Sequence, residues 1–182
     1  MQHFYKSPKF TDDWFSFSKL YSDVVRQFPS GSKFVEVGCY EGRSSAYMAV
    51  EIANSKKDIE FYCVDIWLDG LHKTFTENME SVKDYYTPIH MSSDDAAQKF
   101  ENESLDFVFI DADHHYDSVK RDIEVWWPKV KPGGILAGHD FYPHEPTWGD
   151  VAKVVKEMFP KSHIPLTSIS CFKVNKLVDS DK

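Results

Sequence analysis

The chain has 182 residues, of which 42% are hydrophobic and 15% aromatic, and its formal net charge is -8. This length and apolar content predict one domain, residues 1–182, with a full hydrophobic core. Because the net charge is acidic and the Lys and Arg residues are scattered, nucleic acid and an anionic membrane are disfavoured as partners.

The cysteines and the N-terminus bear on the cellular compartment. Cys39, Cys63 and Cys171 are odd in number, widely spaced and without a C-x-x-C pair, which argues against a disulfide framework and a zinc knuckle. Residues 1–9 lack an apolar signal region, and no apolar run approaches the roughly 18 residues of a membrane span. We therefore expect a cytoplasmic protein that does not contact membranes.

The predicted elements begin with an aromatic-rich segment, residues 1–32, expected to form a helical cap with a helix from about Asp12 to Phe28. Strands and helices then alternate. Strands are predicted at Phe34–Val37, Ile59–Asp65, Thr87–Met91, Leu105–Asp111 and Ile135–His139, and helices at about 43–54, 73–83, 93–102, 115–127 and 148–159. Alternation of this kind predicts an α/β fold, a Rossmann-like doubly wound sheet that is mostly parallel and has helices on both faces.

The C-terminal part predicts how the sheet ends. Pro132-Gly133-Gly134 marks the turn into the fifth strand. The runs Ile164–Ser168 and Ser170–Val174 are too close for a crossover helix and should pair as a hairpin. We therefore expect seven strands, with an antiparallel strand at the end, and a single core over residues 33–182.

A glycine-rich segment, Glu36-x-Gly38-x-Tyr40-x-Gly42-x-Ser44, follows the first predicted strand. Glycines here allow a sharp turn and a close approach of the backbone to a ligand. The spacing is not G-x-G-x-x-G, and a carboxylate at Glu36 would repel a pyrophosphate but suit a cationic amine. A nicotinamide dinucleotide is therefore disfavoured, although a turn of this kind can also be purely structural.

Polar residues recur where the next strands end, and the carboxyl ends of parallel strands meet over one crevice. Asp65 could accept hydrogen bonds from both hydroxyls of a ribose. Ser93 and Asp94 could hydrogen-bond an adenine edge, and Ile66 and Trp67 could pack on its faces. Each residue alone could be a cap or a core residue, but their order and spacing predict a nucleoside-bearing cofactor.

The fourth and fifth predicted strands end in acidic and imidazole side chains. Asp111 and Asp140 would be neighbours across the sheet and offer the oxygen ligands that Mg²⁺ or Mn²⁺ prefers, with His139 as a third ligand. A metal here would lower the pKa of a substrate hydroxyl, and His114 could take its proton. Asp111 and Asp113 could also contact the cofactor. His114 and His139 could equally be structural.

On these residues the chain resembles the class I S-adenosylmethionine-dependent methyltransferases, from about Phe34 to Phe141. The E-x-G-x-Y-x-G-x-S segment is similar to that of the metal-dependent O-methyltransferases of catechol and caffeoyl-coenzyme A type. Those enzymes carry D-x-D-K and G-G-x-x-x-x-D-N segments. This chain has D-x-D-H and G-G-x-x-x-x-H-D instead, and so resembles a group of small methyltransferase-like proteins more closely.

The resemblance implies S-adenosylmethionine as cofactor and methyl transfer to a hydroxyl of a small molecule, with metal ligands at Asp111, His139 and Asp140. It also implies that His114 stands where the family has its basic Lys. Two other functions stay open: a metal-dependent hydrolase, which would leave the glycine loop and Asp65 without a role, and a cofactor-binding module without catalysis. Amino-methylating nucleic-acid enzymes carry an N/D-P-P-Y/F motif after the fourth strand, where this chain has D-A-D-H.

The acceptor is not specified by any motif. Aromatic side chains gather in the N-terminal segment and in two loops, 67–75 and 141–148, which carry Trp67, Phe141, Tyr142, His144 and Trp148. They suggest a flat or sugar ring as acceptor. The same side chains could instead close the core or form the contact of a homodimer.

Overall fold

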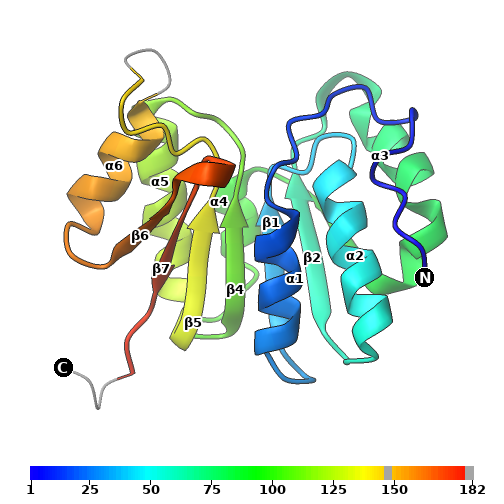
Figure 1. Cartoon of the computed structure of the whole chain (residues 1–182), viewed down its shortest axis with the longest axis horizontal. Helices are drawn as coiled ribbons and strands as arrows, with labels where there is room; N and C mark the ends of the chain where they lie inside the picture. Colours follow the sequence, from blue (N-terminus) through cyan, green and yellow to red (C-terminus); the bar gives the residue numbers. More distant parts are fainter. Residues whose placement is uncertain (146–148, 179–182) are drawn as a thin grey trace.

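A seven-stranded sheet with the order β3-β2-β1-β4-β5-β7-β6 organises the chain (Figure 1). The structure is a computed structural model that describes residues 1–145 and 149–178. The strands are β1 Lys33–Val37, β2 Glu60–Asp65, β3 Thr87–His90, β4 Leu105–Ile110, β5 Val130–Gly138, β6 His163–Leu166 and β7 Cys171–Asn175. Strands β1 to β5 are parallel, and β7 runs antiparallel to both β5 and β6. The predicted Rossmann-like fold with its closing hairpin is confirmed.

Helices cover both faces of the sheet, each over its own apolar core. One face carries α1 Ser18–Gln27, α2 Arg43–Ser55 and α3 Leu71–Met79, with the short helices η1 Leu68–Gly70 and η2 Glu80–Tyr85 flanking α3. The other carries α4 Ser93–Ala97, α5 Tyr116–Trp126, η3 Trp127–Lys129 and α6 Asp150–Met158, and η4 Thr167–Ile169 joins β6 to β7. Among the described residues, no helix combines the length and the apolar character needed to cross a bilayer.

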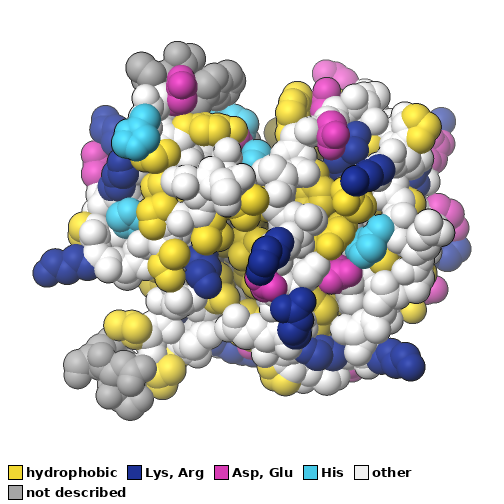
Figure 2. Space-filling view, viewed as in Figure 1, with side chains coloured by type: hydrophobic (Ala, Val, Ile, Leu, Met, Phe, Trp, Pro, Cys, Tyr) yellow, Lys and Arg dark blue, Asp and Glu magenta, His cyan; other side chains and the backbone are white. Residues whose placement is uncertain are grey.

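Strand β4 shows why the sheet is buried on both sides. Phe107 and Phe109 point into the core beneath α1 and α2, whereas Val108 and Ile110 point into the core beneath α5 and α6. A central parallel strand needs apolar side chains at every position for this reason. Charged side chains of both signs are dispersed over the face seen in Figure 2, while hydrophobic ones gather near its middle.

Three predicted boundaries are wrong: the start of the N-terminal helix, the end of α4 and the start of β5. The N-terminal helix begins at Ser18 rather than near Asp12, because the preceding segment binds the glycine loop instead, with the amide of Thr11 donating to Glu41. Helix α4 ends at Ala97 rather than at residue 102, in tight turns from Lys99 and Phe100 to carbonyl groups three residues earlier.

Strand β5 also differs from the prediction, since it begins at Val130 and not at Ile135. Its pairing with β4 changes register between Leu105 and Phe107, so that Pro132-Gly133-Gly134 forms a bulge within the strand instead of a turn before it. Gly133 has a φ of +83°, which favours glycine.

Candidate functional site

The glycine loop after β1 lies directly against the end of β4. Gly38 has a φ of +85°, and a Cβ atom at this position would come within 2.0 Å of the carbonyl oxygen of Asp111. The amide of Asp111 donates to Val37 O at 2.7 Å, and the amide of Gly38 donates to Val64 O at 2.9 Å. Only glycine permits this approach, so the loop and Asp111 form one continuous surface.

Asp65, at the end of β2, shapes the same loop. Its Oδ2 accepts hydrogen bonds from the amides of Cys39 and Tyr40, both at 2.8 Å, and its Oδ1 accepts one from the amide of Trp67 at 2.7 Å. The Trp67 indole is only 3% exposed and donates to the carbonyl of Tyr40 at 2.9 Å. Of the two residues predicted to pack on adenine, Ile66 is therefore the exposed one, whereas Trp67 supports the loop from the core. The ribose contact of Asp65 stays a prediction.

Glu36 is buried beneath the loop, and hydroxyl groups of the chain surround its carboxylate. Oε1 accepts from Tyr21 Oη at 3.0 Å and from Ser44 Oγ at 2.5 Å, and Oε2 accepts from Ser45 Oγ at 2.6 Å. Burial raises the pKa of Glu36 to about 7, although the three hydroxyls act in the opposite direction. The side chains of Glu36 and Ser44 thus bind each other here. Gly42, with a φ of +89°, lies next to them and immediately precedes α2.

The residues predicted to contact the adenine edge lie at the start of α4 and bind α5. Ser93 Oγ accepts from the Trp126 indole at 2.8 Å, and both carboxylate oxygens of Asp94 accept from Arg121 Nε, at 2.9 and 3.0 Å. These contacts fix the position of α4 beside the ends of β2 and β3. A cofactor contact of Ser93 or Asp94 stays a prediction.

Asp113 caps α5. Its carboxylate accepts from the amide of His115 at 3.1 Å and from Ser118 Oγ at 2.7 Å. Partial burial acts to raise the pKa of Asp113, but the hydrogen bonds from Ser118 and His115 lower it to about 2. The side chain is 53% exposed and remains ionised, so its predicted contact with the cofactor would compete with its hydrogen bonds to His115 and Ser118.

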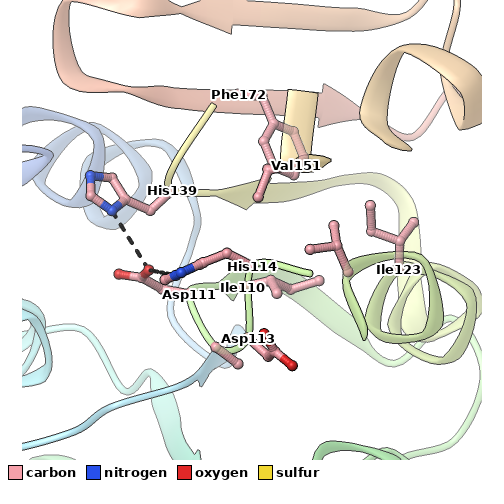
Figure 3. A pocket seen from close by; sticks show the side chains of 10 residues that line it. Ile110, Asp111, Asp113, His114, Ile123, His139, Val151 and Phe172 are labelled. Carbon is pink, nitrogen blue, oxygen red and sulfur yellow. Dashed lines mark ion pairs between the residues drawn. The ribbon is translucent and has the colours of Figure 1, made fainter. Parts of the chain in front are cut away.

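Four side chains converge where β4 and β5 end. Figure 3 shows three of them, Asp111, His114 and His139. His139 Nδ1 lies 3.6 Å from Asp111 Oδ1 and 3.4 Å from Asp140 Oδ1. His114 Nε2 lies 2.8 Å from Asp140 Oδ2 and 4.0 Å from Asp111 Oδ1. A cavity of about 10 Å³, room for about one water molecule, adjoins Asp111, His114 and His139. The predicted catalytic and metal-binding residues are thus brought together.

The charges of this cluster are strongly coupled. Burial alone would lower the pKa of His139, but the carboxylates of Asp111 and Asp140 raise it to about 9. The hydrogen bond to Asp140 raises the pKa of His114. Burial raises the pKa of Asp111, while the two imidazoles hold the pKa of Asp140 well below its usual range despite its burial. The two imidazoles and Asp140 thus favour each other's charged forms.

The donor atoms fit a divalent cation. Ligand atoms of Asp111, His139 and Asp140 all lie within 4.8 Å of one another. Two carboxylates and an imidazole suit Mn²⁺ or Mg²⁺ with water completing the coordination. A second group, Glu36 with Cys39 and Cys63, is equally close but fully buried, and burial raises the pKa of both thiols. Protonated thiols are poor ligands, so the cluster at the sheet edge is the better metal site.

Ser16 completes the cluster from the N-terminal segment, with its Oγ 3.3 Å from His139 Nε2. The Phe17 ring lies 5.0 Å from the imidazole. The aromatic composition of this segment predicts that it caps the sheet or roofs the site, but no motif singles out Ser16. Trp14 is 69% exposed and lies 6.1 Å from the ring of Tyr40, at the rim of the glycine loop.

The aromatic residues of the predicted acceptor loop 141–148 differ in their surroundings. Phe141 is 1% exposed and belongs to the core, whereas Tyr142 is partly exposed and His144 is exposed. Trp148 lies outside the described residues. Among the described Phe, Tyr and Trp residues, the most exposed is Trp14 of the N-terminal segment.

Comparison with known proteins gives both a family and structural relatives. A family model described as a methyltransferase domain matches residues 35–141. The uncharacterized protein y4gI of Sinorhizobium fredii is 24% identical over 148 residues, which cover 72% of this chain but only 16% of that protein. This chain therefore spans a small part of that relative's length.

Solved structures share the fold at low sequence identity. The O-methyltransferase from Bacillus cereus, in complex with S-adenosylhomocysteine, superposes with a TM-score of 0.67 at 16% identity, covering 87% of this chain and 80% of that chain. A SAM-dependent O-methyltransferase from Thermotoga maritima gives a TM-score of 0.67 at 13% identity and covers 95% of this chain and 69% of that chain. At such identities the likeness establishes the fold.

Proposed function

The chain belongs to the methyltransferase-domain family, and on this premise we propose that it methylates a hydroxyl oxygen of a small molecule, using S-adenosylmethionine and a divalent metal. One observation carries the proposal. The glycine loop, where the family binds its cofactor, touches Asp111 through Gly38, and Asp111 belongs to the cluster that would hold the metal. The methyl donor and the activated hydroxyl would therefore meet at one edge of the sheet.

On the cofactor side, the chain's own residues supply a preformed loop. Asp65 fixes the amides of Cys39 and Tyr40, so the loop needs little ordering when a ligand binds. Oδ1 of Asp65 accepts only from the amide of Trp67, and so has a further lone pair with which to accept a hydrogen bond from a ribose hydroxyl.

The acceptor side must supply an oxygen nucleophile. In the transfer, the oxygen forms a bond to the methyl carbon, the carbon–sulfur bond breaks, and the electron pair of that bond stays on sulfur. A bound divalent metal would supply charge that lowers the pKa of the acceptor hydroxyl. Asp111, Asp140 and His139 Nδ1 would hold it, and the loop would place the methyl group for in-line attack. Both structural relatives named above are O-methyltransferases, which supports oxygen as the accepting atom.

The proton of the acceptor hydroxyl needs a base, and His114 is the nearest candidate. Its Nε2 faces Asp140 Oδ2 at 2.8 Å, which requires a hydrogen on Nε2 while Asp140 is ionised. His114 can accept a proton at Nε2 only when Asp140 binds another cation. Base catalysis by His114 is thus expected to depend on occupancy of the metal site.

Calorimetric titration with S-adenosylmethionine and S-adenosylhomocysteine, with and without Mg²⁺, tests the proposal. We expect micromolar binding of both, followed by transfer of labelled methyl to catechol-like or sugar hydroxyls that stops when a chelator is added. An Asp140→Asn variant serves as the matched control, since it should bind the cofactor but lose metal-dependent transfer. Failure of both ligands to bind under either condition would refute the proposal.

A further inference from the structure

The hydroxyl of Ser16 joins His139 to η4. Its Oγ lies 2.9 Å from the carbonyl oxygen of Ile169 and 3.3 Å from Nε2 of His139. A serine hydroxyl has one hydrogen, and a carbonyl oxygen can only accept. The hydrogen of Ser16 therefore points to Ile169, Ser16 accepts from His139, and the hydrogen between these two side chains belongs to Nε2.

The opposite nitrogen of the imidazole faces the carboxylates. Nδ1 of His139 is 3.4 Å from Asp140 Oδ1 and 3.6 Å from Asp111 Oδ1. The ring is 7% exposed and lies against Phe17, so it has little freedom to flip. Ser16 and the two carboxylates thus contact opposite edges of one immobilised ring.

We propose that Ser16 is a positioning residue that keeps the hydrogen of His139 on Nε2 and thereby presents the lone pair of Nδ1 to a divalent cation shared with Asp111 and Asp140. A histidine that binds a metal commonly donates its other N–H to a neighbouring acceptor, which fixes the ring and its tautomer. Here that acceptor comes from the N-terminal segment and is itself oriented by the C-terminal hairpin. The inference rests on the metal that the proposed function requires.

A simple tethering role for Ser16 is less consistent with the contacts around it. The N-terminal segment is already held by Glu41, which accepts from the amide of Thr11 at 2.7 Å, and by Arg43, which donates to the carbonyls of Tyr5 and Phe10 at 2.8 and 3.1 Å. Loss of one hydroxyl should leave these contacts intact. Its effect should fall on the orientation of His139.

The test measures binding of Mn²⁺ alone to the full chain by calorimetry and by the electron paramagnetic resonance signal of free Mn²⁺. We expect one site in the wild type, about 10- to 100-fold weaker binding in Ser16→Ala, and near wild-type binding in Ser16→Thr, which keeps the acceptor. Ser22→Ala is the matched control, because its hydroxyl makes a similar hydrogen bond to Tyr47 at 2.9 Å away from the cluster. It should bind Mn²⁺ like the wild type.

Equal Mn²⁺ affinity in Ser16→Ala and the wild type would overturn the inference. So would the absence of a Mn²⁺ site in a wild-type protein that still binds S-adenosylhomocysteine, an outcome that leaves a metal-free methyltransferase standing. Failure of the wild-type protein to bind S-adenosylhomocysteine would instead contradict the proposed function. If Ser16→Ala does not fold, nitrogen NMR of His139 in the Mg²⁺-bound wild type decides: a hydrogen on Nε2 supports the inference, and one on Nδ1 overturns it.

Discussion

Replacing Glu36 with glutamine should change how the stability of the fold depends on pH. The carboxyl group is 1% exposed, and its pKa is raised from 4.5 in the free side chain to about 7 in the fold. Between these values the folded state holds a proton that the unfolded chain has released. The free energy of unfolding of the wild type therefore falls as pH rises through this window.

The pKa difference fixes the size of the effect. A rise from 4.5 to about 7 corresponds to roughly 3 kcal/mol of stability that is present below pH 4.5 and lost once the pH exceeds the folded pKa. In Glu36→Gln, the amide oxygen can still accept from Tyr21 and Ser44, and the amide nitrogen can donate to Ser45. The variant should match the wild type near pH 4.5 and exceed its stability by up to about 3 kcal/mol at pH 8.

Urea unfolding followed by tryptophan fluorescence between pH 4.5 and 8 measures this difference directly. Subtracting the free energy of unfolding of the variant from that of the wild type at each pH removes the contribution of groups that titrate in both proteins. Tyr21→Phe is a useful companion, since Tyr21 lowers the pKa of Glu36 and its loss should extend the window to higher pH. A wild-type-minus-variant difference that does not change with pH would refute the assignment of a buried, protonatable Glu36.

Other changes probe the loop and the cluster. Gly38→Ala should destabilise the fold by about 2 kcal/mol or more, because its Cβ would collide with Asp111 O at a positive φ; urea unfolding at wild-type levels would contradict this. Asp65→Ala should weaken S-adenosylhomocysteine binding in calorimetry by about 1.5–3 kcal/mol, and unchanged affinity would remove Asp65 from the cofactor site. His114→Ala should flatten the acidic limb of the pH–rate profile, whereas a retained limb would assign His114 a structural role.

The sheet could be predicted because its signals are local. Each parallel strand has a short apolar run with a polar residue at its end, as in Val64-Asp65, and the short connection to β7 leaves room only for a hairpin. The errors at α1 and α4 have another origin. Their starts and ends depend on tertiary contacts, such as Glu41 with Thr11, that helical periodicity does not contain.

The candidate site could be predicted where residues sit at strand ends, as Asp111 and Asp140 do, because sheet topology alone brings such positions together. Burial of Trp67 could not be predicted. The same aromatic side chain after a strand can face a ligand or the core, and here the Tyr40 carbonyl and the Phe75 ring hold it in the core.

The parts of the chain that complete the site lie outside residues 35–141, which match the family. Ser16 and Trp14 come from the N-terminal segment, and Ile169 comes from the C-terminal hairpin. That N-terminal segment is held in place by Glu41 and Arg43. Both belong to the glycine-rich segment, at positions that its motif leaves unspecified. The family match therefore covers both the glycine loop and the cluster at the ends of β4 and β5, whereas the choice of acceptor should depend on residues 1–34. Exchanging Trp14 for alanine should accordingly alter acceptor selection while leaving cofactor affinity unchanged.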